Sequence, residues 1–192
     1  MKQYRKNDEA FTGLEAAIVL IAFVVVAAVF SYVMLGAGFF TSQKSQEVVH
    51  TSVVQASSSM EIRGDVYGLK NSTTGDISAI QFTVALTAGG SPVDINKTVL
   101  TYMTADVVST LNRTATSVST TEGNWTVSEK QNADTDWLLD SGEQFVIKAY
   151  LPTNYYLPAN MPFSIEIRPD VGAALGLKRT VPAQIDAVNL LY

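Results

Sequence analysis

The longest apolar segment of the chain runs from Ala16 to Phe40 and contains no charged residue. Its 25 residues would form a helix about 37 Å long, at about 1.5 Å per residue. About 20 residues are enough to cross the hydrocarbon core of a bilayer. A basic flank of Lys2, Arg5 and Lys6 precedes the segment. The pattern therefore predicts a membrane-inserted helix whose N-terminus stays in the cytoplasm while the rest of the chain lies outside.

The helical pattern continues past Phe40, because residues 41–60 are more polar but contain neither proline nor glycine. Apolar residues spaced four, three and four apart form a seam on one helix face: Val49, Val53, Ala56 and Met60. We predict one helix over about 11–60, apolar on all sides at first and amphipathic later. A small domain cannot bury such an element alone, so it needs a membrane first and other copies of itself afterwards. An alternative for the seam is that it packs on the chain's own head.

Two other interpretations of the apolar segment stay open. A secretory signal peptide has a shorter apolar region of about 7–15 residues, although Gly36, Ala37 and Gly38 are similar to a cleavage site. A plain single-pass anchor needs no removal of the N-terminus. The first interpretation predicts loss of the apolar segment, and the second predicts a monomeric membrane-anchored extracellular binding domain.

After residue 60 the hydrophobic period changes from helical to two. Three segments alternate apolar and polar side chains, as half-buried strands do: 80–86, 145–151 and 163–167. Turn-forming residues separate them, at 71–75, 89–92, 122–124 and 140–142. The apolar C-terminus, 190–192, predicts a final strand buried in the head. The expected fold class is α+β, with a long N-terminal helix and an all-β, Ig-like sandwich over residues 61–192.

Charge and composition exclude several functions. The net charge of −5 argues against a nucleic-acid-binding surface, which requires clustered Lys and Arg. The chain has no cysteine, which excludes disulfides and thiolate chemistry, and its only histidine is His50. We find no nucleophile elbow, phosphate-binding glycine loop or dinucleotide motif, so we predict neither an enzyme nor a cofactor.

Four Asn-X-Thr acceptors for N-glycosylation occur in the head: Asn71, Asn96, Asn112 and Asn124. An acidic segment with Asp134, Asp136, Asp140 and Glu143 offers oxygen ligands, but it lacks the spacing of a calcium loop. We interpret it as a solvated turn and predict no metal site.

The segment Phe11-Thr12-Gly13-Leu14-Glu15 followed by AAIVLIAFVVVAAVF resembles the N-terminus of archaeal flagellins (archaellins), which belong to the type IV pilin-like superfamily. The C-terminal run PFSIEIRPDVGAALGLKRTVPAQIDAVNLLY also resembles archaellins. The resemblance implies a class III signal peptide over residues 1–10, cut between Ala10 and Phe11 by a prepilin-type signal peptidase. A cut after Gly13 is the competing choice.

The same resemblance implies a filament subunit. Glu15 would be fifth in the mature chain, where its carboxylate would pair with the terminal ammonium of Phe11 in a neighbouring subunit. The alternative is that Glu15 merely lies in the first helical turn, where the helix macrodipole favours a negative charge. Implied partners are other copies of the chain or its paralogues, an assembly ATPase and a membrane platform. The product would be an extracellular, glycosylated archaellum that rotates as a propeller, and an adhesion pilus is the nearest rival.

Overall fold

A computed structural model describes residues 4–114 and 122–192, with side chains from Gly13 onward. The chain divides into two compact units, residues 1–51 and 52–192, which are considered separately.

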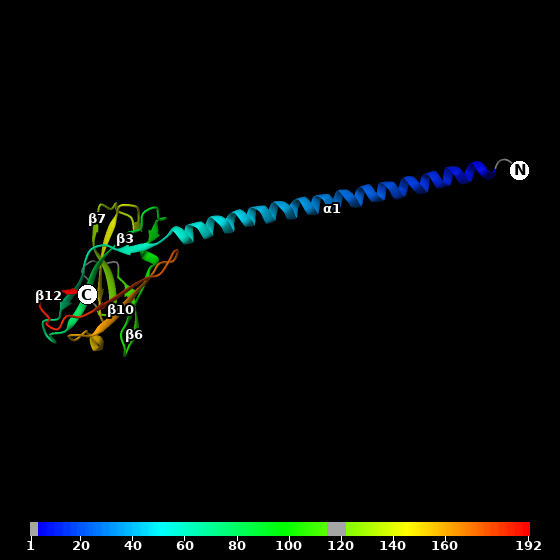
Figure 1. Cartoon of the computed structure of the whole chain (residues 1–192). Helices are drawn as coiled ribbons and strands as arrows, with labels where there is room; N and C mark the ends of the chain where they lie inside the picture. The colour runs from blue at the N-terminus through cyan, green and yellow to red at the C-terminus, as the bar shows by residue number, and fades with distance from the viewer. Residues whose placement is uncertain (1–3, 115–121) are drawn as a thin grey trace. The chain divides into compact units, whose positions relative to one another are not determined.

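The N-terminal element is one uninterrupted helix, α1 (Tyr4–Ser57), as Figure 1 shows. The segment contains no proline, which would remove helical hydrogen bonds. Hydroxyl side chains within it bond back to the helix, as Thr41 Oγ1 does to the Ala37 carbonyl oxygen at 2.8 Å. The predicted long helix is confirmed. It begins earlier than expected, however, because residues 4–10 continue the same helix.

The predicted all-β head is also confirmed. Its elements, in chain order, are β1 (Met60–Ile62), β2 (Val66–Lys70), β3 (Ile77–Leu86), β4 (Val93–Asp94), η1 (Ile95–Lys97), β5 (Val99–Met103), β6 (Val108–Arg113), β7 (Asn124–Gln131), β8 (Leu138–Leu139), β9 (Gln144–Tyr150), η2 (Thr153–Tyr155), β10 (Pro162–Arg168), β11 (Leu175–Thr180) and β12 (Val188–Leu191). The three segments predicted from alternation correspond to β3, β9 and β10.

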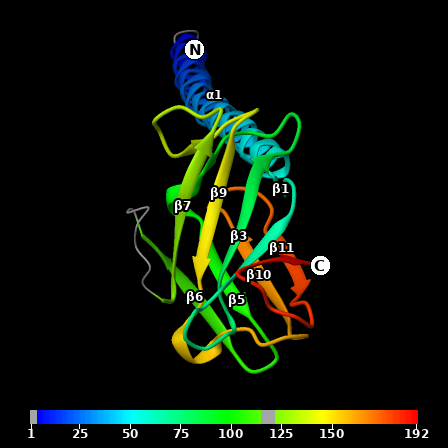
Figure 2. The same ribbon diagram turned by 90° about the vertical axis from the view of Figure 1, so that its left-hand side faces the viewer.

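The strands form a nearly closed sandwich. The main sheet has the order β11-β10-β5-β6-β7-β9-β3-β2-β12, and β1 pairs with β3. Figure 2 shows β7, β9 and β3 in one layer and β6, β5, β10 and β11 in the layer behind. Short parallel pairing of β6 with β7 joins the layers on one side. On the other side Thr180 and Tyr192 exchange backbone hydrogen bonds of 2.6 and 3.4 Å.

The core lies between the two layers and follows the period-two pattern of the strands. Its largest fully buried side chains include Phe82, Tyr102, Trp125 and Phe145. The hydroxyl of Tyr102 donates to the Tyr155 carbonyl oxygen at 3.1 Å, so this buried polar group is satisfied. Glycines with positive φ occupy the predicted turns, for example Gly75 at +85° and Gly142 at +93°.

The prediction for the C-terminus is wrong in part. It does form a strand, β12, and Leu191 is buried with 3% exposure. Leu190 and Tyr192, by contrast, are 51% and 70% exposed. Successive side chains of a strand point to opposite faces, so only every second residue of an apolar run enters the core.

Candidate assembly helix and its connection to the head

The surface of α1 is apolar on every side from Leu14 to Phe40. Consecutive residues such as Ile18, Val19 and Leu20 are 65%, 54% and 66% exposed, so no single face is covered. Within Gly13–Ser57, the most apolar window of 18 residues has a mean hydropathy of 2.9, and none of that window is buried. By length and composition this helix is able to cross a membrane.

Glu15 is the one charged residue between Gly13 and Phe40, and its side chain is exposed. Among residues 13–114 and 122–192 it has no ion-pair partner. In the uncut chain it lies eleven residues after the helix start at Tyr4, so it is not in the first turn of α1. Ala10 and Phe11 are helical in backbone, and their side chains are outside the described set.

The predicted seam is present over three of its four positions. Val49 and Val53 are each 61% exposed, and Ala56 is exposed on the same helix. The fourth position is wrong. Met60 belongs to β1, opposite Leu86, and is 5% exposed within the head core.

Helix α1 ends at a run of three serines just before Met60. α1 ends at Ser57, whose hydroxyl bonds the Val54 carbonyl oxygen at 3.2 Å. Serine side chains that bond nearby backbone groups compete with helical hydrogen bonding, so a run of them favours a helix end. The chain becomes extended after Ser58 and Ser59, and Met60 then follows the period-two pattern of a strand.

The same serines form a junction, here defined as Ser57, Ser58 and Ser59, in which the Ser57 and Ser59 hydroxyls are hydrogen-bonded and the buried Ser58 hydroxyl has no partner among the described residues. The hydroxyls of Ser57 and Ser91 are 3.0 Å apart, and those of Ser59 and Thr87 are 2.7 Å apart. The junction backbone is bonded as well, since the Ala173 amide donates to the Ser58 carbonyl oxygen at 3.0 Å. The end of α1 is therefore tied to the head strands.

Gly172 makes the approach to the junction possible. Its φ is +113°, and a Cβ there would lie 2.1 Å from the Ser58 carbonyl oxygen. Sequence reasoning did not identify the junction or Gly172. The only available signal was three successive serines between a helical and an alternating pattern.

The acidic segment forms a turn held by its own carboxylates. Glu143 accepts the amides of Asp134 and Asp140 at 3.1 and 3.0 Å, and Asp134 accepts the Asp136 amide at 2.9 Å. Desolvation, followed by repulsion from Glu143, raises the pKa of Asp140. These contacts give the carboxylates a structural role in the turn.

The four glycosylation acceptors differ in accessibility. Asn71 lies in the β2–β3 turn, where its Oδ1 accepts the Thr73 amide at 2.7 Å. Asn112 is exposed on β6 and directly opposite Asn124 on β7. The acceptor threonines that follow Asn96 and Asn124 are buried: Thr98 is 4% exposed and Thr126 is 2% exposed.

Known proteins share both the helix and the head. A family model described as archaeal-type flagellin matches residues 10–179. "Probable flagellin 1" of Archaeoglobus fulgidus is 42% identical, over 98% of each chain.

Solved structures agree. The chain of the archaeal flagellum of Methanospirillum hungatei strain JF1 is 34% identical with a TM-score of 0.76, covering 94% of this chain and 99% of that one. The crystal structure of archaeal flagellin FlaB1 from Methanocaldococcus jannaschii, at 20% identity and a TM-score of 0.58, covers 69% of this chain and 95% of that one, and it supports the fold alone. With a family model over most of its length and a close full-length relative, the chain belongs to the archaeal-type flagellin family.

Proposed function

We propose that this chain is the structural subunit of an archaeal flagellar filament, which polymerises through α1 and serves swimming motility. The observation that carries the proposal is the apolar surface of α1, exposed on all sides while the head has a complete core of its own. At about 25 cal/mol per Å² of apolar surface, leaving this helix in water would cost tens of kcal/mol. Packing against other copies removes that surface from water. The role is structural, as expected of a family of filament subunits.

The route to the filament begins in the membrane. We propose that the precursor inserts with its leader in the cytoplasm and its head outside, and that a prepilin-type signal peptidase cuts between Ala10 and Phe11. The family match beginning at residue 10 supports this boundary. An assembly ATPase and a membrane platform would then move α1 from lipid into the filament base, so its apolar surface is never transferred to water.

Glu15 supplies a register for assembly. A lone carboxylate in an apolar environment is costly to desolvate unless it is paired. In our proposal it binds the terminal ammonium of Phe11 from a neighbouring subunit, created only when the leader is removed. Val49, Val53 and Ala56 would pack between subunits further along α1, while Met60 serves the head core.

The exposed outside of the filament would carry N-linked glycans at Asn71 and Asn112. In the folded head both asparagines precede threonines that are not fully buried, Thr73 and Thr114. The buried Thr98 and Thr126 argue against modification of Asn96 and Asn124. Mass spectrometry of glycopeptides tests this assignment, and a glycan on Asn124 would contradict it.

The first test is mass spectrometry of the N-terminal peptide from appendages sheared off cells. A chain that begins at Phe11 and keeps the entire apolar helix supports the proposal. A chain that begins at Met1, or after Gly38, would exclude it in favour of an anchored monomer or an ordinary secreted domain.

A second test separates a propeller from an adhesion pilus. Deletion of the gene is expected to abolish swimming and leave surface attachment intact, and the unsubstituted gene should restore swimming. Loss of attachment with normal swimming would favour the pilus.

A further inference from the structure

Two of the four glycosylation acceptors lie side by side on an outward face of the head. Asn112 is the Cα partner of Asn124 in the parallel pairing of β6 with β7. The next pair is Arg113 with Trp125, and Trp125 is 1% exposed in the core. Because successive side chains of a strand point to opposite faces, Asn112 and Asn124 both point outward.

The two asparagines differ as acceptors. Asn112 is exposed and its acceptor residue Thr114 is half-buried, whereas Asn124 is half-buried and its acceptor residue Thr126 is buried. The proposed function therefore assigns a glycan to Asn112 and leaves Asn124 unmodified. Adjacent strands are about 4.8 Å apart, so a sugar on each asparagine would compete for the same space.

The carboxamide of Asn124 is available to bind a ligand. Among the residues that the structure describes, the asparagines whose side chains form hydrogen bonds are Asn71 and Asn189. The Asn124 side chain carries two N–H donors and a carbonyl acceptor. Sugar hydroxyls both donate and accept, so they match the two kinds of group that this side chain presents.

The other side of Asn112 is apolar. Leu100 on β5 pairs with Leu111 on β6, and both are buried, so the neighbouring residues Val99 and Asn112 come together on the outward face. Val99 is 44% exposed. A sugar on Asn112 thus meets methyl groups if it turns toward β5, and hydrogen-bonding groups of Asn124 if it turns toward β7.

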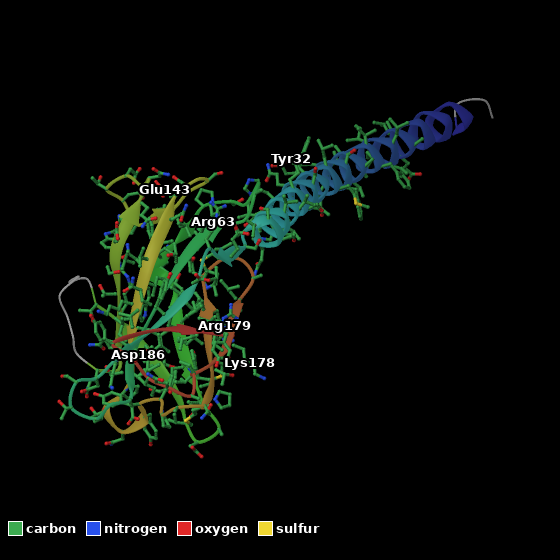
Figure 3. All side chains as sticks on the ribbon, turned by 60° about the vertical axis from the view of Figure 1, so that its left-hand side comes forward. Tyr32, Arg63, Glu143, Lys178, Arg179 and Asp186 are labelled. Atoms are coloured by element: carbon green, nitrogen blue, oxygen red, sulfur yellow. The ribbon has the colours of Figure 1, made fainter. Side chains whose placement is uncertain are left out.

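Charged residues of both signs border this pair of asparagines. Arg168, Lys148 and Glu122 occupy nearby strand and turn positions. The basic residues Lys178 and Arg179, labelled in Figure 3, are on β11, three strands away from β6 in the sheet order. Because the surroundings have no single sign of charge, hydrogen bonding decides which ligand fits, and uncharged sugar hydroxyls meet that condition.

We propose that the side chain of Asn124 is the binding site for the first sugar of a glycan attached to Asn112. The inference rests on the proposed function, which supplies the glycan. Attachment replaces one hydrogen of Asn112 Nδ2 with the sugar and leaves Oδ1 unchanged. The covalent tether holds the sugar at a high effective concentration beside Asn124. The contact turns the glycan over the β6–β7 pairing, which is two residue pairs long and joins the two layers of the head.

A double-mutant cycle tests the proposal. Full-length Asn124→Ala is produced in an archaeon that N-glycosylates its own flagellins, alone and combined with Asn112→Gln, which removes the attachment site. Val99→Ala, alone and in the same combination, is the matched control on the opposite side of Asn112. Mass spectrometry gives the occupancy of Asn112, and tryptophan fluorescence of the detergent-solubilised chain gives the melting temperature of the head.

We expect Asn124→Ala to lower the melting temperature by about 3 °C in the glycosylated chain and by less than about 1 °C in the Asn112→Gln background. Val99→Ala is expected to have the same effect in both backgrounds. Asn124→Val, which suits a strand, repeats the cycle if the alanine variant does not fold.

An equal loss from Asn124→Ala in the two backgrounds would overturn the proposal, because the sugar would then make no contact with Asn124. A glycan-dependent loss at Val99→Ala and not at Asn124→Ala would overturn it as well, since the sugar would lie toward β5. Absence of a glycan from Asn112 of the unsubstituted chain would instead refute the glycosylation assigned by the proposed function, and the inference with it.

Discussion

Helix α1 and the head place their apolar side chains in opposite ways. On α1, Val24 and Phe30 are 59% and 66% exposed, whereas Phe82 and Phe145 in the head are 1% and 0% exposed. The head completes its own core, and α1 has none to enter. The difference shows that one region is folded by contacts within the chain and the other requires surroundings supplied by lipid or by other subunits.

A charge placed within α1 is expected to have the largest effect, because α1 depends on apolar surroundings outside the chain. We expect Val26→Asp to abolish filaments, because a charged residue at the centre of a membrane helix costs about 2.5–3.5 kcal/mol on insertion and adds an unpaired charge to the assembled core. Filaments are counted by electron microscopy of sheared fractions, and Val26→Leu is the matched control.

The head should be unaffected by that substitution. Both tryptophans, Trp125 and Trp137, are in the head, so their fluorescence in the detergent-solubilised full chain reports head unfolding alone. A drop of several degrees in the melting temperature of Val26→Asp would show that the two regions are not independent.

Substitution of Gly172 should destabilise the head at the junction. In Gly172→Ala, the positive φ costs about 1–3 kcal/mol, and the contact with the Ser58 carbonyl oxygen adds to this. Urea unfolding followed by tryptophan fluorescence measures the loss. Gly176→Ala is the control, since its Cβ meets nothing within 4 Å. Equal effects of the two substitutions would contradict the role of Gly172.

Removal of the Asn189 amide should weaken the register of β12. Asn189→Ala leaves the buried Gly68 carbonyl oxygen and the Asp186 amide without this partner, which costs about 1–3 kcal/mol. Asn154→Ala, at an exposed position in η2, should change the unfolding free energy by no more than about 0.5 kcal/mol. Slow amide exchange retained at Leu191 in Asn189→Ala would argue that other contacts suffice to hold the strand.

The smallest effect is expected from the acidic turn. The pKa of Asp140 is raised by desolvation and by neighbouring carboxylates, so the folded head holds this proton more tightly than the unfolded chain. The ionised carboxylate therefore reduces stability above its folded pKa, and the penalty disappears as the pH falls below the ordinary Asp value. Asp140→Asn should raise the melting temperature slightly at pH 7, with no gain at pH 3, because exposed charges are well screened. The same gain at both pH values would exclude an electrostatic cause.

Much of the architecture follows from local patterns. The uncharged segment of 25 residues predicts a helix, and residues 41–60, which contain neither proline nor glycine, predict that it continues beyond Phe40. Alternation at 80–86 and 163–167 is enough to predict β3 and β10. The candidate roles of Val49 and Val53 also follow from spacing along one helix, whereas the role of Glu15 is implied by the resemblance to archaellins.

Two features required the tertiary structure. Met60 has the spacing of the helical seam, but α1 ends at Ser57 and the methionine enters the core of the head. The apolar C-terminus predicts burial, but hydrogen bonds of Asn189 turn Val188 and Leu190 outward.

The sequence by itself determined which segments are helical or extended, that the helix is too apolar to remain in water, and which family the chain resembles. These properties depend on residues close together in the chain. The tertiary structure alone decided where α1 ends against Gly172 and Ser91, and which face of β12 is exposed. Those outcomes depend on residues far apart in sequence, such as Gly68 and Asn189, which are 121 residues apart and whose contact no local pattern encodes.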